Sequence, residues 1–366
     1  MKTVDPTHRT VYAELSQRTL DARFASDFPS DGRFVRWTRG ERAYWYFDRA
    51  GEDGRRVRRY VGPVDDEAIT ERVTEHRGLK SDVRARRKLV SMLVREAYLP
   101  APDPLAGDVV AALADAGFFR LRGVLVGSVA YGCYPAHLGI RLPDATLRTG
   151  DADFAQFHSI AIAVDDATDD VGTVLREVDP TFSAIPDQID GRRATRFRNA
   201  EGYQVEFLTP NRSSDDHMGK AASMPSLTGT DATPLRFLDY LIHEPVRAIM
   251  LHRSGVSVTI PAPARYAVHK LIVATRRCTD DATDGGAKSD KDLAQATTLM
   301  RALIVLRRSD ELAEAWMEAW GRGPAWREAI TAGCRRLDPS GRTEVLKGLR
   351  SGAASLGCDP SAYGLG

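Results

Sequence analysis

The sequence predicts an α+β protein in which a mixed β-sheet core with helices lies between a small N-terminal β-hairpin and helix module and a C-terminal helical bundle. Residues 34–63 alternate aromatic or apolar side chains with basic ones, a pattern typical of short antiparallel strands. From Asp108 onward helical and strand-like patterns follow one another, and from about Ala264 the pattern is helical. We therefore expect three parts, with boundaries at residues 1–104, 105–262 and 263–366.

The N-terminal part is expected to hold two or three strands, a helix and a linker. Turn signals at Arg39-Gly40 and at residues 51–54 divide the stretch 34–63 into antiparallel strands. A basic amphipathic helix follows, over roughly residues 65–98. The segment YLPAPDPLAG indicates a linker, because three prolines within a few residues resist both helix and sheet.

The middle of the chain predicts helices and strands in succession. DVVAALADAG has helical spacing and stops at Gly117, and FRLRGVLVGS predicts a buried strand that enters a glycine turn. We expect CYPAHLGIRLPDATLRT to be a long irregular segment, followed by a strand in TGDADFA. A helix over residues 171–178 and a hairpin come next; the hairpin joins ATRFRN to GYQVEFLTP through a turn at residues 200–202.

The C-terminal part predicts a small bundle. In RYAVHKLIVATRR the apolar residues fall on one side, which leaves Lys270 and Arg277 near one another on a polar face. In the next helix Lys288 and Lys291 share the early polar face. We expect the last dozen or so residues, rich in Gly, Ser and Ala, to be loose.

Composition limits the classes of function. The formal net charge of +1 excludes overall charge attraction to nucleic acid as the main feature, although nine arginines against four acids make the segment Arg33–Arg59 locally basic. The four cysteines form no CxxC pair, which argues against a zinc ribbon and suits a reducing cytoplasm. No apolar run approaches the about 20 residues of a transmembrane helix, so we expect a cytoplasmic protein without membrane association.

Two aspartates and a glycine turn form the candidate site. Because strand side chains alternate, Asp151 and Asp153 should project from one face, while the residue between them and the one after them point into the core. Two carboxylates on one face can hold a divalent cation, and the turn at Gly127-Ser128 can present backbone N–H groups to phosphate oxygens. Glu206, in the second strand of the hairpin, is the natural third carboxylate. This arrangement suits chemistry on a metal-bound nucleoside triphosphate.

The ordered set Gly127-Ser128, Asp151-Ala152-Asp153 and Glu206 resembles the DNA polymerase β-like nucleotidyltransferase superfamily. The pattern of that superfamily is a strand ending in Gly-Ser, an Asp-x-Asp strand and a third acid on a later strand. The chain is similar to a bacterial branch of it, near the minimal transferases of toxin and abortive-infection systems, through GSVAYGCY, TGDADFA, VEFLTP, LDYLIHEP, RYAVHKLIVATRR and KSDKDLAQA. The resemblance covers about residues 105–306. Two features depart from the pattern: the separation of Ser128 from Asp151 is longer than usual, and the third acid is a glutamate.

The resemblance implies a nucleotidyltransferase fold and a two-metal reaction. Asp151 and Asp153 would bind Mg²⁺ or Mn²⁺ with Glu206 completing the second metal site, and Gly127 and Ser128 would hold the β- and γ-phosphates of an NTP. A nucleotidyl group would then pass to an acceptor hydroxyl with release of pyrophosphate. A cation on the helical part would neutralise phosphate charge; Lys270 fits best, and the weaker candidates are Arg277, Lys288 and Lys291.

Several alternatives stay open. Lys270 is also compatible with a solvated helix face, and Glu206 with an ordinary edge-strand acid. The segment Arg33–Arg59 either recruits the acceptor, an RNA such as tRNA or a protein, or it merely packs a small sheet and keeps its outer face soluble. Two further functions are a non-catalytic nucleic-acid-binding or regulatory protein that retains the fold, and transfer onto a small molecule, as in antibiotic-modifying relatives. The sequence leaves the oligomeric state open.

Overall fold

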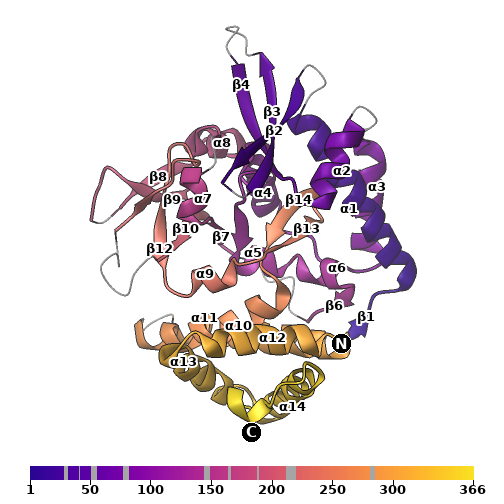
Figure 1. Cartoon of the computed structure of the whole chain (residues 1–366). Helices are drawn as coiled ribbons and strands as arrows, with labels where there is room; N and C mark the ends of the chain where they lie inside the picture. Colours follow the sequence, from indigo (N-terminus) through magenta and orange to yellow (C-terminus); the bar gives the residue numbers. More distant parts are fainter. Residues whose placement is uncertain are drawn as a thin grey trace.

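The α+β class is confirmed by the structure, a computed structural model (Figure 1). A small sheet with three helices, a larger mixed sheet and a layer of C-terminal helices follow one another through the molecule (Figure 1). Among the described residues, no helix is both long and apolar enough to cross a lipid bilayer. The structure describes residues 1–28, 32–40, 42–50, 56–76, 82–143, 149–163, 166–187, 189–211, 220–280 and 285–366.

The N-terminal part consists of an antiparallel sheet of the order β2-β3-β4 with three helices, and the predicted strands are confirmed. Gly40, in the turn between β2 and β3, has a φ of 62°, which a residue with a side chain rarely adopts. The predicted turn at residues 51–54 lies outside the described residues. The elements are α1 (Pro6–Asp27), β2 (Arg33–Arg39), β3 (Arg42–Ala50), β4 (Arg56–Pro63), α2 (Glu67–Glu75) and α3 (Val83–Arg95).

Two helical features of this part differ from the prediction. The sequence reading missed α1, which begins where the side chain of Asp5 accepts a hydrogen bond from Thr7 N and Pro6 fills the first helical position. The single helix predicted over residues 65–98 is wrong, because two helices occupy that range. Asp82 caps the second one by accepting a hydrogen bond from Ala85 N. A capping aspartate starts a new helix even where the apolar period continues through it.

The N-terminal part is attached to the core through the segment that follows the glycine turn. The strand β1 (Lys2–Thr3) pairs antiparallel with β6 (Ile140–Arg141), and Leu15 of α1 packs in one cluster with Ala136. The long irregular segment predicted after Cys133 is therefore wrong in part, because it contains β6 and the helix α6 (Tyr134–Leu138). The predicted domain boundaries at residues 104 and 262 stay predictions.

The central sheet is mixed and has the order β11-β12-β10-β7-β5, with β9 also beside β10 and β8 beside β9. Strand β10 runs parallel to β7 and β12, whereas β5 runs antiparallel to β7. The predicted helix at 171–178 and the predicted hairpin are confirmed. The strand in FRLRGVLVGS is shorter than predicted, because Leu121 N donates a hydrogen bond back to Gly117 O in a turn. The elements are α4 (Pro104–Asp115), β5 (Val124–Val126), α5 (Gly127–Tyr131), β7 (Asp151–Ala155), α7 (His158–Ala163), α8 (Val171–Val178), β8 (Ser183–Pro186), β9 (Ala194–Arg198), β10 (Gln204–Pro210), β11 (Ala222–Ser223) and β12 (Asp231–Leu235).

The C-terminal helices share one buried core with the central sheet. Phe154 and Phe207 of the sheet belong to the same apolar cluster as Tyr266 and Trp316 of the helices. The expectation of a loose C-terminus is wrong, because Leu365 is buried and its carbonyl oxygen accepts a hydrogen bond from Arg350 Nε. The elements are α9 (Leu238–Leu241), β13 (Val246–Met250), β14 (Val256–Ile260), α10 (Pro263–Asp280), α11 (Gly285–Val305), α12 (Ser309–Gly321), α13 (Pro324–Arg335), α14 (Pro339–Ser355) and the 3₁₀ helix η2 (Pro360–Tyr363).

Candidate active site

Strand β7 places Asp151 and Asp153 on one face of the central sheet. Ala152 and Phe154, on the other face, are 1% and 0% exposed, so the predicted alternation is confirmed. Strand β10 runs parallel beside β7, and its register sets Glu206 directly opposite Asp153. Residues that stand opposite each other in neighbouring strands share a face. The three acids predicted to act together therefore lie on the same face of two adjacent strands.

Gly127 forms the turn between β5 and α5, directly against Asp153. Val126, the last residue of β5, pairs with Asp153 in the antiparallel register, which brings the turn to this carboxylate. Gly127 has a φ of 67°, and a Cβ at this position would overlap Asp153 Oδ2. The backbone angle strains a residue with a side chain, and a side chain here would push the Asp153 carboxylate aside. Gly127 therefore allows the turn and this carboxylate to lie together.

The carboxyl group of Glu206 is drawn away from the two aspartates. Its Oε1 accepts a hydrogen bond of 3.3 Å from Thr233 Oγ1, and Thr233 belongs to β12, on the side of β10 opposite β7. Burial raises the pKa of the Glu206 carboxyl; Arg196 and the Thr233 hydrogen bond oppose this rise, and the charge of Asp151 adds to it. A divalent cation beside Glu206 would add to the compensation that Arg196 and Thr233 provide.

Tyr203 is a residue of this site that sequence reasoning missed. It stands just before β10, and its buried hydroxyl has no hydrogen-bond partner among the described residues. Burial raises the pKa of this hydroxyl well above its ordinary value, and the charges of Asp151 and Asp153 raise it further. Leaving a buried hydroxyl unpaired costs about 1–3 kcal/mol. The position suits a hydroxyl that pairs with an oxygen of a bound ligand near the aspartates.

The aspartate pair fits a divalent cation by its chemistry, although the three acids do not form a closed cluster. Within the described part of the chain, no group of three or more His, Cys, Asp or Glu side chains is placed to hold a metal ion. Asp151 and Asp153 offer the carboxylate oxygens that Mg²⁺ prefers, and the glycine turn lies directly against Asp153. Thr149 Oγ1 also donates a hydrogen bond to Asp151 Oδ1. Glu206 can join these ligands only after it turns from Thr233.

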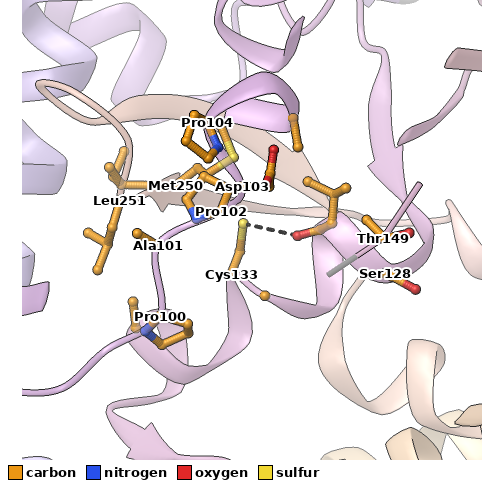
Figure 2. A pocket seen from close by; sticks show the side chains of 15 residues that line it. Pro100, Ala101, Pro102, Asp103, Pro104, Ser128, Cys133, Thr149, Met250 and Leu251 are labelled. Carbon is orange, nitrogen blue, oxygen red and sulfur yellow. Dashed lines mark hydrogen bonds between the residues drawn. The ribbon is translucent and has the colours of Figure 1, made fainter. Parts of the chain in front are cut away.

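A cavity of about 250 Å³ opens beside Ser128 and Thr149 (Figure 2). The linker at residues 100–104 and Leu251 form the wall farther from these two residues (Figure 2). Asp103 is the single charged residue among the described residues that line it. A cavity with this lining suits a neutral or cationic group better than a phosphate, because a buried anion needs a compensating charge.

Tyr266 and Lys270 of α10 are buried behind the glycine turn. Lys270 is 7% exposed, and its Nζ lies 2.5 Å from Asp292 Oδ1 of α11, so the alternative of a solvated helix face is wrong. Helix α11 packs on the polar face of α10. The hydroxyl of Tyr266 lies 3.0 Å from the carbonyl oxygen of Gly127 and 3.0 Å from Gln295 Oε1. Through Tyr266 the helical part reaches the turn.

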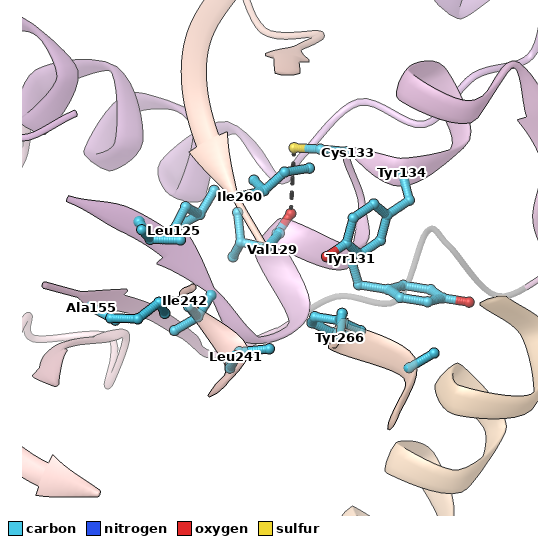
Figure 3. Close-up of a cluster of buried hydrophobic side chains, with 14 of the residues drawn as sticks. Leu125, Val129, Tyr131, Cys133, Tyr134, Ala155, Leu241, Ile242, Ile260 and Tyr266 are labelled. Carbon is cyan, nitrogen blue, oxygen red and sulfur yellow. Dashed lines mark hydrogen bonds between the residues drawn. The ribbon is translucent and has the colours of Figure 1, made fainter. Parts of the chain in front are cut away.

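Sequence reasoning did not identify Tyr266 as part of the site. Its ring lies beside Tyr131 and Tyr134 (Figure 3), and Lys270 Nζ is 5.2 Å from the centroid of the ring. The signal in the sequence is its place one helical turn before Lys270. A contact with Gly127 joins residues far apart along the chain, so only the fold reveals it.

The remaining predicted cations lie elsewhere on the helical part. Lys288 is exposed and Lys291 is half-buried, both near the start of α11. The side chain of Arg277 lies outside the described residues. The structure thus brings Gly127 and Ser128 to the aspartates, and it places Lys270 in an ion pair behind them.

A family model described as Nucleotidyltransferase matches residues 105–321 of the 366. The match begins in α4, contains the glycine turn, β7 and β10, and ends at the last residue of α12. The N-terminal sheet β2-β3-β4 lies outside it. A search of curated proteins and a search of solved structures each found no match.

Proposed function

The chain belongs to this nucleotidyltransferase family, and from that premise we propose that it moves a nucleotidyl group from a nucleoside triphosphate to an acceptor hydroxyl. The observation that supports the proposal best is the contact between Gly127 and Asp153. A glycine turn with a φ of 67° lies directly against a carboxylate on a neighbouring strand, so a phosphate held by the backbone N–H groups of the turn would lie next to the acidic pair. In the reaction the acceptor oxygen bonds to the α-phosphorus, the bond to pyrophosphate breaks, and the hydroxyl proton leaves to solvent or to a nearby carboxylate.

The residues of the site receive these roles. Asp151 and Asp153 hold the divalent cation, Mg²⁺ or Mn²⁺, and Glu206 completes the ligand set after turning from Thr233. The cation, when bound, supplies the positive charge that offsets the triphosphate and the developing charge at the α-phosphorus. Gly127 and Ser128 position the β- and γ-phosphates. Lys270 supports the site indirectly, because its ion pair with Asp292 joins α10 to α11 beside Tyr266.

The acceptor that we favour is an RNA such as tRNA, with a protein as the next choice. The N-terminal sheet, which the family match leaves out, provides a basic surface for such a partner. An NTP donor and an RNA acceptor are both found in the cytoplasm, the compartment that the cysteine pattern predicts. A growth-arresting role, as in the toxin systems near which the sequence resemblance lies, follows if the acceptor is tRNA.

The cavity beside Ser128 favours a second candidate, in which the acceptor is a small molecule. Its volume of about 250 Å³ suits a compact ring system, and its lining suits a neutral or cationic compound that carries a hydroxyl group. The catalytic residues would be the same in both cases. The two candidates differ in whether the transferred label ends on a macromolecule or on a compound of low mass.

Transfer of label from NTPs tests the proposal. Purified chain with Mg²⁺ is incubated with cellular RNA, cellular protein and a small-molecule extract, using NTPs labelled at the α- or the γ-phosphorus. We expect α-label alone to become attached to an acceptor, and the double variant Asp151→Ala with Asp153→Ala to lose about 10³-fold or more of this rate. Attachment of γ-label, or an unchanged rate in the double variant, contradicts the proposal. Clustered carboxylates repel without a cation, so we expect the double variant to keep its fold.

A further inference from the structure

The two faces of the sheet β2-β3-β4 differ in what covers them. On one face Phe47 and Val61 pack with Phe24 of α1 and with Phe28. Arg59 belongs to this face and donates a hydrogen bond to the carbonyl oxygen of Asp27. The register places Arg33, Trp37, Arg42, Tyr44, Arg56 and Arg58 on the other face, which we call the Trp37 face, together with the buried side chains of Tyr46, Asp48 and Tyr60.

Trp37 is an exposed aromatic side chain held in a fixed arrangement. It is 50% exposed, and the guanidinium carbon of Arg58 lies 4.7 Å from the centroid of its ring. Arg58 is itself fixed by Asp48, whose buried carboxylate accepts a hydrogen bond of 2.8 Å from Arg58 Nε. One side of the indole ring is thus occupied by a cation, and half of its surface remains free to stack.

The described side chains of the Trp37 face carry more positive than negative charge. Among its described side chains, four arginines stand against one carboxylate, Asp48, which pairs with both Arg56 and Arg58 and leaves a net positive charge. Arg33 and Arg42 are exposed. A polyanion on this face would neutralise the charges of these arginines.

An exposed aromatic ring between arginines fits an unpaired base with its phosphates. A base in a duplex is already stacked and paired, whereas a base in a single strand can lie on an aromatic ring while arginines contact the flanking phosphates. We propose that the Trp37 face binds a single-stranded segment of RNA, with a base on Trp37 and phosphates beside the arginines. The choice of RNA rests on the proposed function, in which the acceptor supplies a ribose hydroxyl.

Fluorescence anisotropy with a short labelled RNA that has no secondary structure tests this surface. The full chain carries Asp151→Ala and Asp153→Ala, so that no transfer occurs during the titration. We expect Trp37→Ala to weaken binding about tenfold and Trp37→Phe to restore most of it. The pair Arg33→Gln with Arg42→Gln should weaken binding and lower the salt slope by about two. The matched control is the pair Arg84→Gln with Arg87→Gln, two exposed arginines of α3, which should keep the affinity of the parent.

Several outcomes overturn the inference. The first is no binding to RNA, and the second is equal affinity with and without the Trp37 side chain. Equal losses of affinity from the two arginine pairs would mean that binding depends on net charge alone. Equally tight binding of duplex RNA, or of DNA of the same sequence, would remove the assignment to single-stranded RNA. If RNA binds through this face while the wild type transfers no label, the surface stands and the proposed reaction fails.

Discussion

The central sheet and the N-terminal sheet each present charged side chains on one face, but they hold them differently. On the central sheet Asp153 lies against Gly127, and the hydroxyl of Tyr266 meets that turn from behind, within a packed core. On the N-terminal sheet half of the Trp37 surface is exposed, and Arg58 above it is paired with Asp48. The first arrangement holds Asp153 against the turn, whereas the second leaves its aromatic and basic groups accessible to a partner.

This difference fits the two tasks that we assign to the sheets. Chemistry at a phosphorus atom requires groups held to a fraction of an ångström, and a packed core provides that precision. Binding of an extended polyanion requires accessible charge and an aromatic surface instead. Substitutions at the central sheet should therefore act mainly on the rate of transfer, and substitutions on the Trp37 face mainly on affinity for the acceptor.

The largest effect is expected from Gly127→Ala. The added Cβ would displace the Asp153 carboxylate, and the φ of 67° strains an alanine, so we expect the transfer rate to fall about 100-fold or more. Initial rates with labelled NTP measure this. Gly150→Ala is the matched control, because nothing lies within 4 Å of a Cβ at that position, and it should keep the wild-type rate. Similar rates in the two variants would show that the close contact has no role.

Tyr266→Phe should have the next largest effect. It removes the hydroxyl that meets Gly127 O and keeps the ring, so we expect the KM for NTP to rise about five- to tenfold with a small change in Tm. Tyr134→Phe is the control, since its equally buried hydroxyl donates to Pro261 O at 2.9 Å, away from the turn. Equal changes in KM for both variants would mean that loss of packing, and not the turn, explains the effect.

Glu206→Gln should change stability in a pH-dependent way. The pKa of Glu206 is raised above its ordinary value of 4.5 mainly by burial, so the native state resists its ionisation. Below pH 4.5 the carboxyl is protonated in both the folded and the unfolded state; as the pH rises through the raised pKa, the wild type loses stability that the glutamine variant keeps.

Thermal unfolding in EDTA measures this difference. We expect equal Tm values at pH 4 and a Tm of the glutamine variant a few degrees higher at pH 8. Glu201→Gln, at an exposed acid in the turn before β10, should show no such trend. A glutamine variant that is less stable than the wild type at pH 8 would contradict the account of Glu206.

The smallest effect is expected for the stability of Trp37→Ala. Trp37 is half exposed, so we expect a change in unfolding free energy of about 1 kcal/mol or less. Phe47→Ala, on the packed face of the same sheet, should cost about 3–5 kcal/mol because Phe47 is 0% exposed. Urea unfolding of the two variants compares the faces. A large loss from Trp37→Ala would make its ring structural and weaken the case for an RNA surface.

The sequence was sufficient where local pattern decides structure. The alternation around Asp151, the helix at residues 171–178 and the turn at Gly127 all follow from spacing along the chain, and the structure confirms them. The roles of the acids, the metal and the acceptor stay predictions. The helix α1 was missed because few of its residues are buried, so its apolar pattern is weak.

What the sequence could not supply are contacts between distant segments. The hydroxyl of Tyr266 meets Gly127 only because α10 packs behind the sheet, and Lys270 is buried only because α11 covers its face. The same holds for Tyr203, which lies near the aspartates through the pairing of β10 with β7, and whose hydroxyl has no partner in the part of the chain that the structure describes. The spacing of apolar residues indicates which face of a helix or strand is apolar. It does not indicate which polar face another helix or strand will cover.

The most direct test of the central claim is Mn²⁺ binding in the presence of an NTP analogue with a methylene bridge between the α- and β-phosphorus atoms. Electron paramagnetic resonance of free Mn²⁺ follows the titration. We predict that the wild type binds Mn²⁺ with the analogue and that Asp151→Ala with Asp153→Ala abolishes this binding. The control, Asp169→Ala with Glu201→Ala, removes two exposed acids elsewhere and should bind as the wild type does. Equal Mn²⁺ affinity in the wild type and the Asp151 and Asp153 double variant would contradict the account.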